Sequence, residues 1–205
     1  MKTINMKTLK NASRRFGYNS LAGFILGMTV GVGSALGNPT DPTVIAGSAS
    51  FGSTGSVLEI QNSPGTIIDW RDFSIDQDEI TRFVQESSNS AILNRVTGGN
   101  LSQILGQLQS NGRVFLINPN GLVIGENAEI DTAGFVASTL DIDNQDFRDQ
   151  NFSFNGSGGS IENRGLIHVR GNGELALIAS SIENSGVLRS DSGCLLYTSP
   201  SPRDS

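Results

Sequence analysis

"SIENRGLIHV" at Ser160–Val169 recurs 21 residues later as "SIENSGVLRS" at Ser181–Ser190, and this repeat decides the fold. It places Asn163 and Asn184 at equivalent positions. A repeat of about 20 residues is typical of a solenoid, in which each copy forms one coil stacked on its neighbour. The apolar residues are then expected to point inward. The Asn-x-Gly corners are expected to use glycine at positive φ and to stack asparagine on asparagine.

A related pattern precedes the two copies. "AEIDTAGFVAS", which begins at Ala128, places Ile130 and Gly134 in the roles that Ile161 and Gly165 have in the repeat. We interpret it as a further coil.

The rest of the chain has the composition of a protein made of short strands. Aromatic residues make up only 6% of it, and runs of Val, Ile, Leu and Phe are bounded by Gly, Asn and Ser. The clearest helical spacing is "LSQILGQL" at Leu101–Leu108, which predicts a short helix or turn because Gly106 interrupts it. The non-repetitive stretch from Asn38 to about Gln85 is expected to cap the first coil, since open strand edges invite aggregation.

One turn stands between two very apolar runs. In "RVFLINPNGLVIG", Asn118-Pro119-Asn120-Gly121 separates Val114–Ile117 from Leu122–Ile124, and both flanks read as buried strands. Pro119 suits the second position of a type I turn, Asn118 can cap it, and Gly121 suits its last position. The simplest interpretation is a turn that only reverses the chain.

Both ends of the chain differ from its middle. Residues 1–37 have the features of an export signal: a charged start, an uncharged apolar stretch at Leu21–Val32, and small residues at Ala35 and Gly37. The mature chain is then expected to begin at Asn38. Residues 194–205 break the preceding composition, and their back-translation resembles a transposon-end sequencing adapter. We interpret them as foreign and the reading frame as truncated from a longer one.

The segment 38–193 is strongly acidic. It contains eight arginines and no lysine against 19 acidic residues, a net charge of −11. Such a charge argues against nucleic acid as a partner. The only cysteine of the sequence, Cys194, lies in the tail that we interpret as foreign, so no disulfide is expected. A chain without crosslinks can be threaded unfolded through a narrow pore.

The residue types needed for catalysis or metal binding are scarce. His168 is the only histidine and lies within the repeat, where a packed or exposed solenoid side chain is expected rather than a catalytic base. The acidic stretch with Asp76, Asp78 and Glu79 lacks the glycine and the distal glutamate of an EF-hand, which favours a solvated loop. We therefore expect no enzyme activity, no metal and no cofactor.

Several ordered blocks of the sequence are similar to one family. They are "VIAGSASF" from Val44, "IIDWRDFSI" around Trp70, "EITRFVQ" from Glu79, "SAILNRVTGG" from Ser90, "SQILGQLQSNGRVFLINPNGLVIG" from Ser102 and "AEIDTAGFVASTLDI" from Ala128. Together they resemble the secretion domain of two-partner secretion exoproteins, the filamentous haemagglutinin N-terminal domain, over nearly all of residues 38–193. The high-molecular-weight adhesin branch is the more similar one, because a second motif, Asn-Pro-Asn-Leu, is missing.

This resemblance implies a fold, a route and a set of partners. The fold is a right-handed parallel β-helix with an N-terminal cap and extra-helical hairpins. The route runs through the Sec machinery to the periplasm of a Gram-negative bacterium. There the POTRA domains of an outer-membrane transporter recognise the domain, and the protein ends secreted or at the cell surface.

The resemblance also implies roles for residues. Those of the Asn118–Gly121 turn are implicated in export and in nucleating folding, and Trp70, Asn94 and Arg95 belong to the family's motifs. Sequons at Asn100, Asn151 and Asn155 can accept sugar in the adhesin branch. Binding of host or surface glycans is expected of regions downstream of Gly193.

Two alternatives stay open at this point. A polysaccharide lyase can have the same β-helix and uses carboxylate-bound calcium with a basic residue. A glycan-binding module needs no catalytic group at all.

Overall fold

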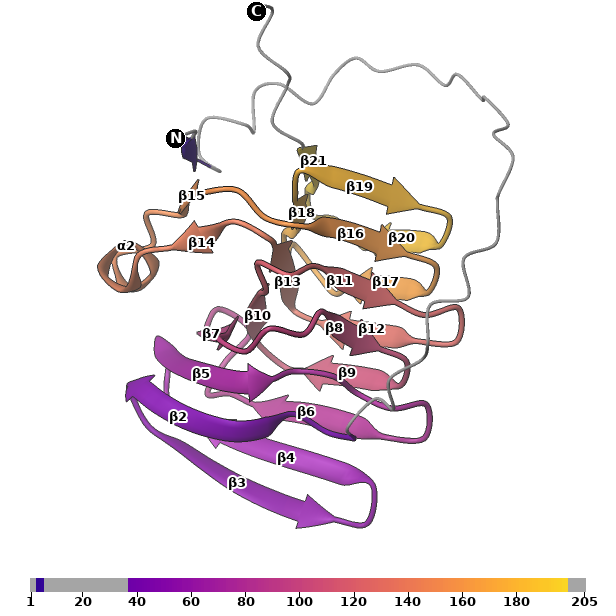
Figure 1. Cartoon of the computed structure of the whole chain (residues 1–205). Helices are drawn as coiled ribbons and strands as arrows, with labels where there is room; N and C mark the ends of the chain where they lie inside the picture. The colour runs from indigo at the N-terminus through magenta and orange to yellow at the C-terminus, as the bar shows by residue number, and fades with distance from the viewer. Residues whose placement is uncertain (1–2, 6–36, 199–205) are drawn as a thin grey trace, which may run out of the picture.

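The computed structural model describes residues 3–5 and 37–198, and most of them wind into a solenoid of three sheets (Figure 1). The first sheet contains β3 (Ala49–Thr54), β4 (Val57–Asn62), β6 (Ile80–Val84), β9 (Gln107–Ser110), β12 (Glu129–Thr132), β17 (Leu166–Val169) and β20 (Val187–Ser190). The second contains β2 (Thr40–Ala46), β5 (Thr66–Asp72), β7 (Ala91–Val96), β10 (Arg113–Ile117), β13 (Gly134–Ser138), β18 (Leu175–Ile178) and β21 (Leu195–Thr198). The third contains β8 (Ser102–Ile104), β11 (Leu122–Ile124), β16 (Ser160–Asn163) and β19 (Ser181–Asn184).

About six turns stack along the solenoid. Between β5 and β6 the chain contributes only a single bridge, at Ile75, beside the third sheet, and from β8 onward each coil runs through the three sheets in turn. Neighbouring strands of successive coils pair in parallel, as β10 does with β7 and β13. The predicted all-β fold and parallel β-helix are therefore confirmed. No helix among the residues placed by the structure is long and apolar enough to cross a membrane.

The repeat marks adjacent coils, as predicted. Strand β16 pairs with β19 so that Asn163 lies beside Asn184, and the Nδ2 of Asn163 donates a hydrogen bond of 2.7 Å to the Oδ1 of Asn184. The expected positive φ at Gly165 and Gly186 is wrong. Glycine is needed there for close approach instead, because a Cβ on Gly165 would lie 2.5 Å from the carbonyl oxygen of Gly125.

The related pattern at 128–138 belongs to a coil but in a different register from the one predicted. Ile130 pairs with Ile167, whereas the partner of Ile161 is Leu122. Gly134 opens a strand of the second sheet rather than a corner. The similarity misleads because alternating apolar and polar residues occur in most strands of the coils.

The cap is shorter than predicted. Only β2 and β3 pair antiparallel with the first coil, against β5 and β4 respectively, so the cap ends near Thr54 rather than Gln85. The coils after it show no visible repeat because their lengths vary. Thr66 and its partner Ile92 are 26 residues apart, whereas Val114 and Phe135 are 21 apart.

For residues 101–108, where the spacing predicts a short helix or turn, the helix is wrong, because these residues form β8 and the start of β9 with a bend at Gly106 between them. Ile104 and Leu108 are fully buried, while Leu101 is 43% exposed. The leucines therefore lie on two strands that meet at a corner.

Strands β10, β13 and β18 of the second sheet are buried on both faces. One face lines the solenoid interior, and the other contributes Phe115, Val136 and Ile178 to a second apolar cluster. This explains the continuous apolar runs of β10, β13 and β18, since a strand buried on both faces need not alternate.

An excursion from the solenoid, residues 140–158, covers that outer face (Figure 1). It consists of β14 (Asp141–Ile142), α2 (Asn144–Arg148) and β15 (Ser153–Asn155), where β14 and β15 pair antiparallel. The rings of Phe147 and Phe152 lie 5.2 and 4.8 Å from the ring of Phe115, measured between centroids. Burying each ring contributes about 2 kcal/mol. The expected extra-helical hairpin is thus present.

The two ends are described only in part. Strand β1 (Thr3–Asn5) pairs antiparallel with β15. The rest of the predicted signal lies outside the described residues, apart from Gly37. In the tail interpreted as foreign, β21 pairs with β18, and residues 199–205 lie outside the described residues.

Candidate functional site

The Asn118–Gly121 segment forms the predicted turn. The amide of Gly121 donates to the carbonyl oxygen of Asn118 at 3.1 Å, which closes the turn. The side chain of Asn118 caps it, because its Oδ1 accepts from the amide of Asn120 at 2.9 Å. Gly121 has a φ of +117°, in the region that favours glycine.

The turn is a corner between two sheets and not a hairpin. Strand β10 pairs with β7 and β13, while β11 pairs with β8 and β16, so the flanking strands share no hydrogen-bonded pair. A folding nucleus at this turn must therefore include neighbouring coils.

Asn118 connects the turn to the preceding coil. Its side chain is fully buried, and its Nδ2 donates to the carbonyl oxygen of Asn100 at 3.0 Å and to the Oγ of Ser102 at 2.9 Å. The exposed Asn120 donates to the carbonyl oxygen of Gly98 at 2.8 Å.

The turn also supports the following coil. The amide of Gly159, where the chain returns from the excursion, donates to the carbonyl oxygen of Pro119 at 2.8 Å. A Cβ on Gly121 would lie 2.9 Å from the carbonyl oxygen of Ser160. Gly159 and Ser102 are thus parts of the site that sequence reasoning missed, because their partners lie in other coils.

Trp70 and Asn94, both predicted as motif residues, contact each other in the interior. The Nε1 of Trp70 donates to the Oδ1 of Asn94 at 3.0 Å, and both side chains are at most 1% exposed. Asn94 in turn donates to the carbonyl oxygen of Phe115 at 3.3 Å. The pair therefore satisfies a buried indole and links three successive strands of the second sheet.

Arg95, the third motif residue, holds the excursion against the solenoid. Its Nε lies 2.9 Å from the Oδ1 of Asp141, and another of its nitrogens donates to the carbonyl oxygen of Ile142 at 2.7 Å. A second ion pair joins it to Asp69 at 3.3 Å. The arginine side chain is 15% exposed, so these contacts are only partly screened by water.

The three sequons do not form one site. Asn100 lies in the corner below the turn, where its Nδ2 donates to Asp72 at 2.8 Å. Asn151 and Asn155 lie in the excursion, where Asn151 donates to the Oδ1 of Asp146 at 3.1 Å and Asn155 to the carbonyl oxygen of Ser153 at 3.4 Å.

The acidic stretch forms a self-capped turn. The amide of Gln77 donates to Asp76 at 2.8 Å, and the amide of Asp76 donates to Glu79 at 3.1 Å. Within the described part of the chain, no three His, Cys, Asp or Glu side chains are grouped so as to hold a metal ion.

His168 lies in a surface network of charged side chains. Its Nε2 is 3.0 Å from the Oδ1 of Asp191, and its Nδ1 is 3.6 Å from the Oδ1 of Asp131. The hydrogen bond from His168, followed by one from the amide of Gly171, lowers the pKa of Asp191. The network joins β12, β17 and the segment after β20 on the surface of the first sheet.

Three kinds of comparison relate the chain to known proteins: a family model, curated relatives and a solved structure. The family model described as the TPS secretion domain matches residues 38–197. The heme/hemopexin-binding protein of Haemophilus influenzae (strain ATCC 51907 / DSM 11121 / KW20 / Rd) is 45% identical over 111 residues, which cover 54% of this chain and 12% of that protein. A second Haemophilus influenzae protein of that name is 46% identical over 83 residues, 40% of this chain and 9% of the relative.

A solved structure shows the same fold. The crystal structure of the HMW1 secretion domain from Haemophilus influenzae matches with a TM-score of 0.74 and 42% identity, over 78% of this chain and 45% of that one. The chain thus spans about a tenth of its curated relatives and under half of the solved domain. With the parallel β-helix and the family match over most of its length, the chain belongs to the family of TPS secretion domains.

Proposed function

We propose that residues 38–193 are recognised in the periplasm by the POTRA domains of an outer-membrane two-partner secretion transporter. Sec export and removal of residues 1–37 precede this step. The Asn118–Gly121 turn then contributes both to recognition and to folding during export. The family membership supports a transporter of this class and a secreted or surface location in a Gram-negative bacterium.

One observation carries the proposed role of the turn. Pro119 and Asn120 are exposed, whereas Asn118 and Gly121 are buried and contact the coils on both sides. The same four residues thus offer a surface to a partner and fix the stacking of three coils. A partner that binds the exposed pair would align the coils as they form.

The test separates a role of the turn in export from a role in the native fold alone. Asn120→Ala removes an exposed side chain whose hydrogen bond contributes about 1 kcal/mol. Asn118→Ala leaves buried groups without partners and costs about 1–3 kcal/mol. Both variants should lower surface release in cells that carry the cognate transporter, while the purified chains still refold.

The matched control is Asn127→Ala, an exposed asparagine in another corner of the same coil. It should leave release unchanged. Normal release of both turn variants, or their failure to fold in isolation, would contradict a role in export. The turn would then serve only to reverse the chain.

We also propose that sugar, where it is attached at Asn100, Asn151 or Asn155, is added before the domain folds. Each of these carboxamides donates a hydrogen bond in the folded chain. A mass spectrum of secreted protein with unmodified peptides at all three positions would refute glycosylation.

We propose no catalytic role for the domain. His168 is held between two carboxylates on the solenoid surface, an arrangement that gives the imidazole a structural role. The two curated relatives are named for binding heme and hemopexin, and this chain spans only a small part of them. We therefore assign the binding of host or surface glycans that makes such an exoprotein an adhesin to regions downstream. Sugar cleavage by the purified chain would contradict this assignment and favour a lyase.

A further inference from the structure

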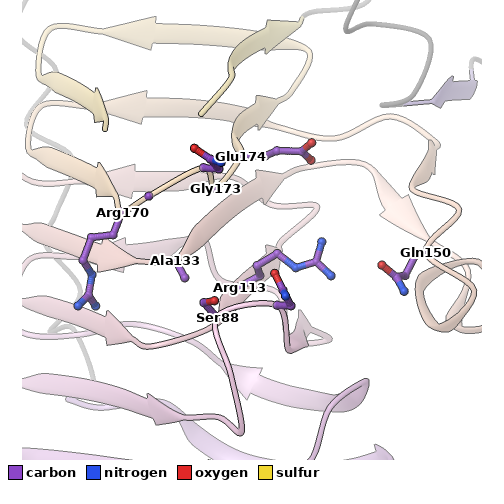
Figure 2. Close-up of a pocket in the computed structure, with 10 residues that line it drawn as sticks. Ser88, Arg113, Ala133, Gln150, Arg170, Gly173 and Glu174 are labelled. Carbon is purple, nitrogen blue, oxygen red and sulfur yellow. The ribbon is translucent and has the colours of Figure 1, made fainter. Parts of the chain in front are cut away.

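Two adjoining cavities lie between the solenoid and the excursion, at the corner that leads from the first sheet to the second. The first has a volume of about 370 Å³ and the second about 290 Å³. They share Arg113 and Gln150, whose side chains extend toward each other across the first cavity (Figure 2). Together they have the size of a site for one or two sugar rings.

The cavities are a local concentration of positive charge in an acidic domain. Of the eight arginines in residues 38–193, three line them, namely Arg113, Arg148 and Arg170, against one carboxylate, Glu174. Arg170 pairs with Asp131 at 2.9 Å, and its side chain is directed away from Arg113 (Figure 2). The positive charge at the cavities therefore comes from Arg113, which lies in the wall that they share, and from Arg148. An anion is the ligand that this charge favours.

Arg113 is also incompletely satisfied. Its Nε is buried and has no hydrogen-bond partner among the described residues. Burial lowers the pKa of the guanidinium, and the attraction of the nearby Glu174 carboxylate offsets only part of that shift. Its guanidinium carbon lies 5.8 Å from the centroid of the Phe152 ring, which fixes one of its faces. Because the Nε is buried, the two Nη groups are the donors that can bind a carboxylate in the cavity, in the bidentate manner that a planar guanidinium allows.

The other residues that line the first cavity suit the hydroxyl groups of a sugar. Ser88, Asn89, Asn172 and Gln150 bring hydroxyl and carboxamide groups to the first cavity, next to the Glu174 carboxylate. Such groups both donate to and accept from sugar hydroxyls. No aromatic residue lines this first cavity, so its recognition is polar rather than by stacking.

We propose that these cavities bind an acidic sugar, with its carboxylate on Arg113 and its hydroxyls on the surrounding amides and hydroxyls. This is a site separate from the Asn118–Gly121 turn and independent of the proposed role in export.

The test is a titration of the purified chain followed by amide chemical shifts in NMR, with D-glucuronate, D-glucose and acetate as ligands. Glucuronate should shift the amides of Ser88, Gly171 and Gly173, and should bind at least about tenfold more tightly than glucose, since a hydrogen bond to a charged group is lost without the carboxylate. Acetate, which has no hydroxyls, should also bind more weakly.

Two variants test the assigned residues, and one serves as control. Arg113→Gln should reduce glucuronate binding to the level of glucose. Gln150→Glu, at an exposed position, should weaken glucuronate binding by like-charge repulsion without any change in fold. Arg189→Gln, which removes an arginine that lines neither cavity, should bind like the unaltered chain.

Four results would overturn the proposal: no shifts at the cavity, equal affinity for glucuronate and glucose, acetate binding as tightly as glucuronate, or unchanged binding by both cavity variants. If the circular dichroism spectrum of Arg113→Gln differs from that of the unaltered chain, its loss of binding reports misfolding. The proposal is then tested by glucuronate binding to Gln150→Glu alone.

Discussion

Asn118 is fully buried, and its side chain bonds both to its own turn and to the preceding coil. The capping of its own turn is predictable, because the partner, Asn120, is two residues away. Its bonds to Asn100 and Ser102 span 18 and 16 residues and depend on how coils stack. Trp70 and Asn94 are 24 residues apart, so for the same reason the sequence indicates them as two separate motif residues and does not indicate their hydrogen bond.

At the same scale, we predict that Asp191 makes stability dependent on acid. Its folded-state pKa is lowered, so its contribution is fully present above its unfolded pKa of about 4 and is lost as the pH falls through the folded value. The difference in urea midpoint between the unaltered chain and Asp191→Asn should therefore shrink as the pH falls from about 5 to about 2.

His168→Ala, which removes the first cause of that shift, should reduce the same difference. A difference between unaltered chain and Asp191→Asn that stays constant over this pH range would contradict the assignment.

At the scale of elements, the corners between strands were predicted less well than the strands. "LSQILGQL" has helical spacing only because a corner at Leu105 and Gly106 joins two short strands with inward residues. The sequence of the excursion is not repetitive and does not itself indicate what it packs against. The one sign of this packing in the sequence is that β10, β13 and β18 are continuously apolar.

We predict that Gly165→Ala destabilises the solenoid by about 1–3 kcal/mol, because its Cβ would lie 2.5 Å from one backbone oxygen and 2.6 Å from another. Neither the carbonyl oxygen of Gly125 nor that of Ala128 can move without disturbing a coil. Urea unfolding monitored by circular dichroism measures the effect.

Gly99→Ala is the matched control, since nothing lies within 4 Å of the new Cβ and its φ is not positive. It should change stability by no more than about 0.5 kcal/mol. Equal midpoints for the two variants would show that the corner tolerates a side chain.

At the scale of the molecule, Asn38, the predicted first residue of the mature chain, is built into the fold. The Nδ2 of Asn38 donates to the carbonyl oxygen of Ser56 at 3.3 Å, and its Oδ1 accepts from the hydroxyl of Thr81 at 2.9 Å. A peptidase could not reach the bond before Asn38 easily once the first coil has closed. We therefore predict that the signal is removed before the first coil closes.

We accordingly predict cleavage after Gly37. N-terminal sequencing of periplasmic or secreted protein should give Asn38 as the first residue. Ala35→Arg, which places a large charge where a signal peptidase requires a small residue, should accumulate precursor. A secreted protein that retains Leu21–Val32 would contradict the prediction.

The regular stacking of the coils has a mechanical consequence. The 21 residues that separate Ile161 from its neighbour Ile182 span roughly 70 Å when the chain is extended. Once folded, the coil lengthens the rod by only about 4.8 Å. In the proposed export through an outer-membrane transporter, each coil that closes at the exit takes up a length of extended chain more than ten times the length that it adds to the rod. Chain taken up in a closed coil is no longer available to diffuse back through the pore, so coil formation opposes backward motion as well as building the rod.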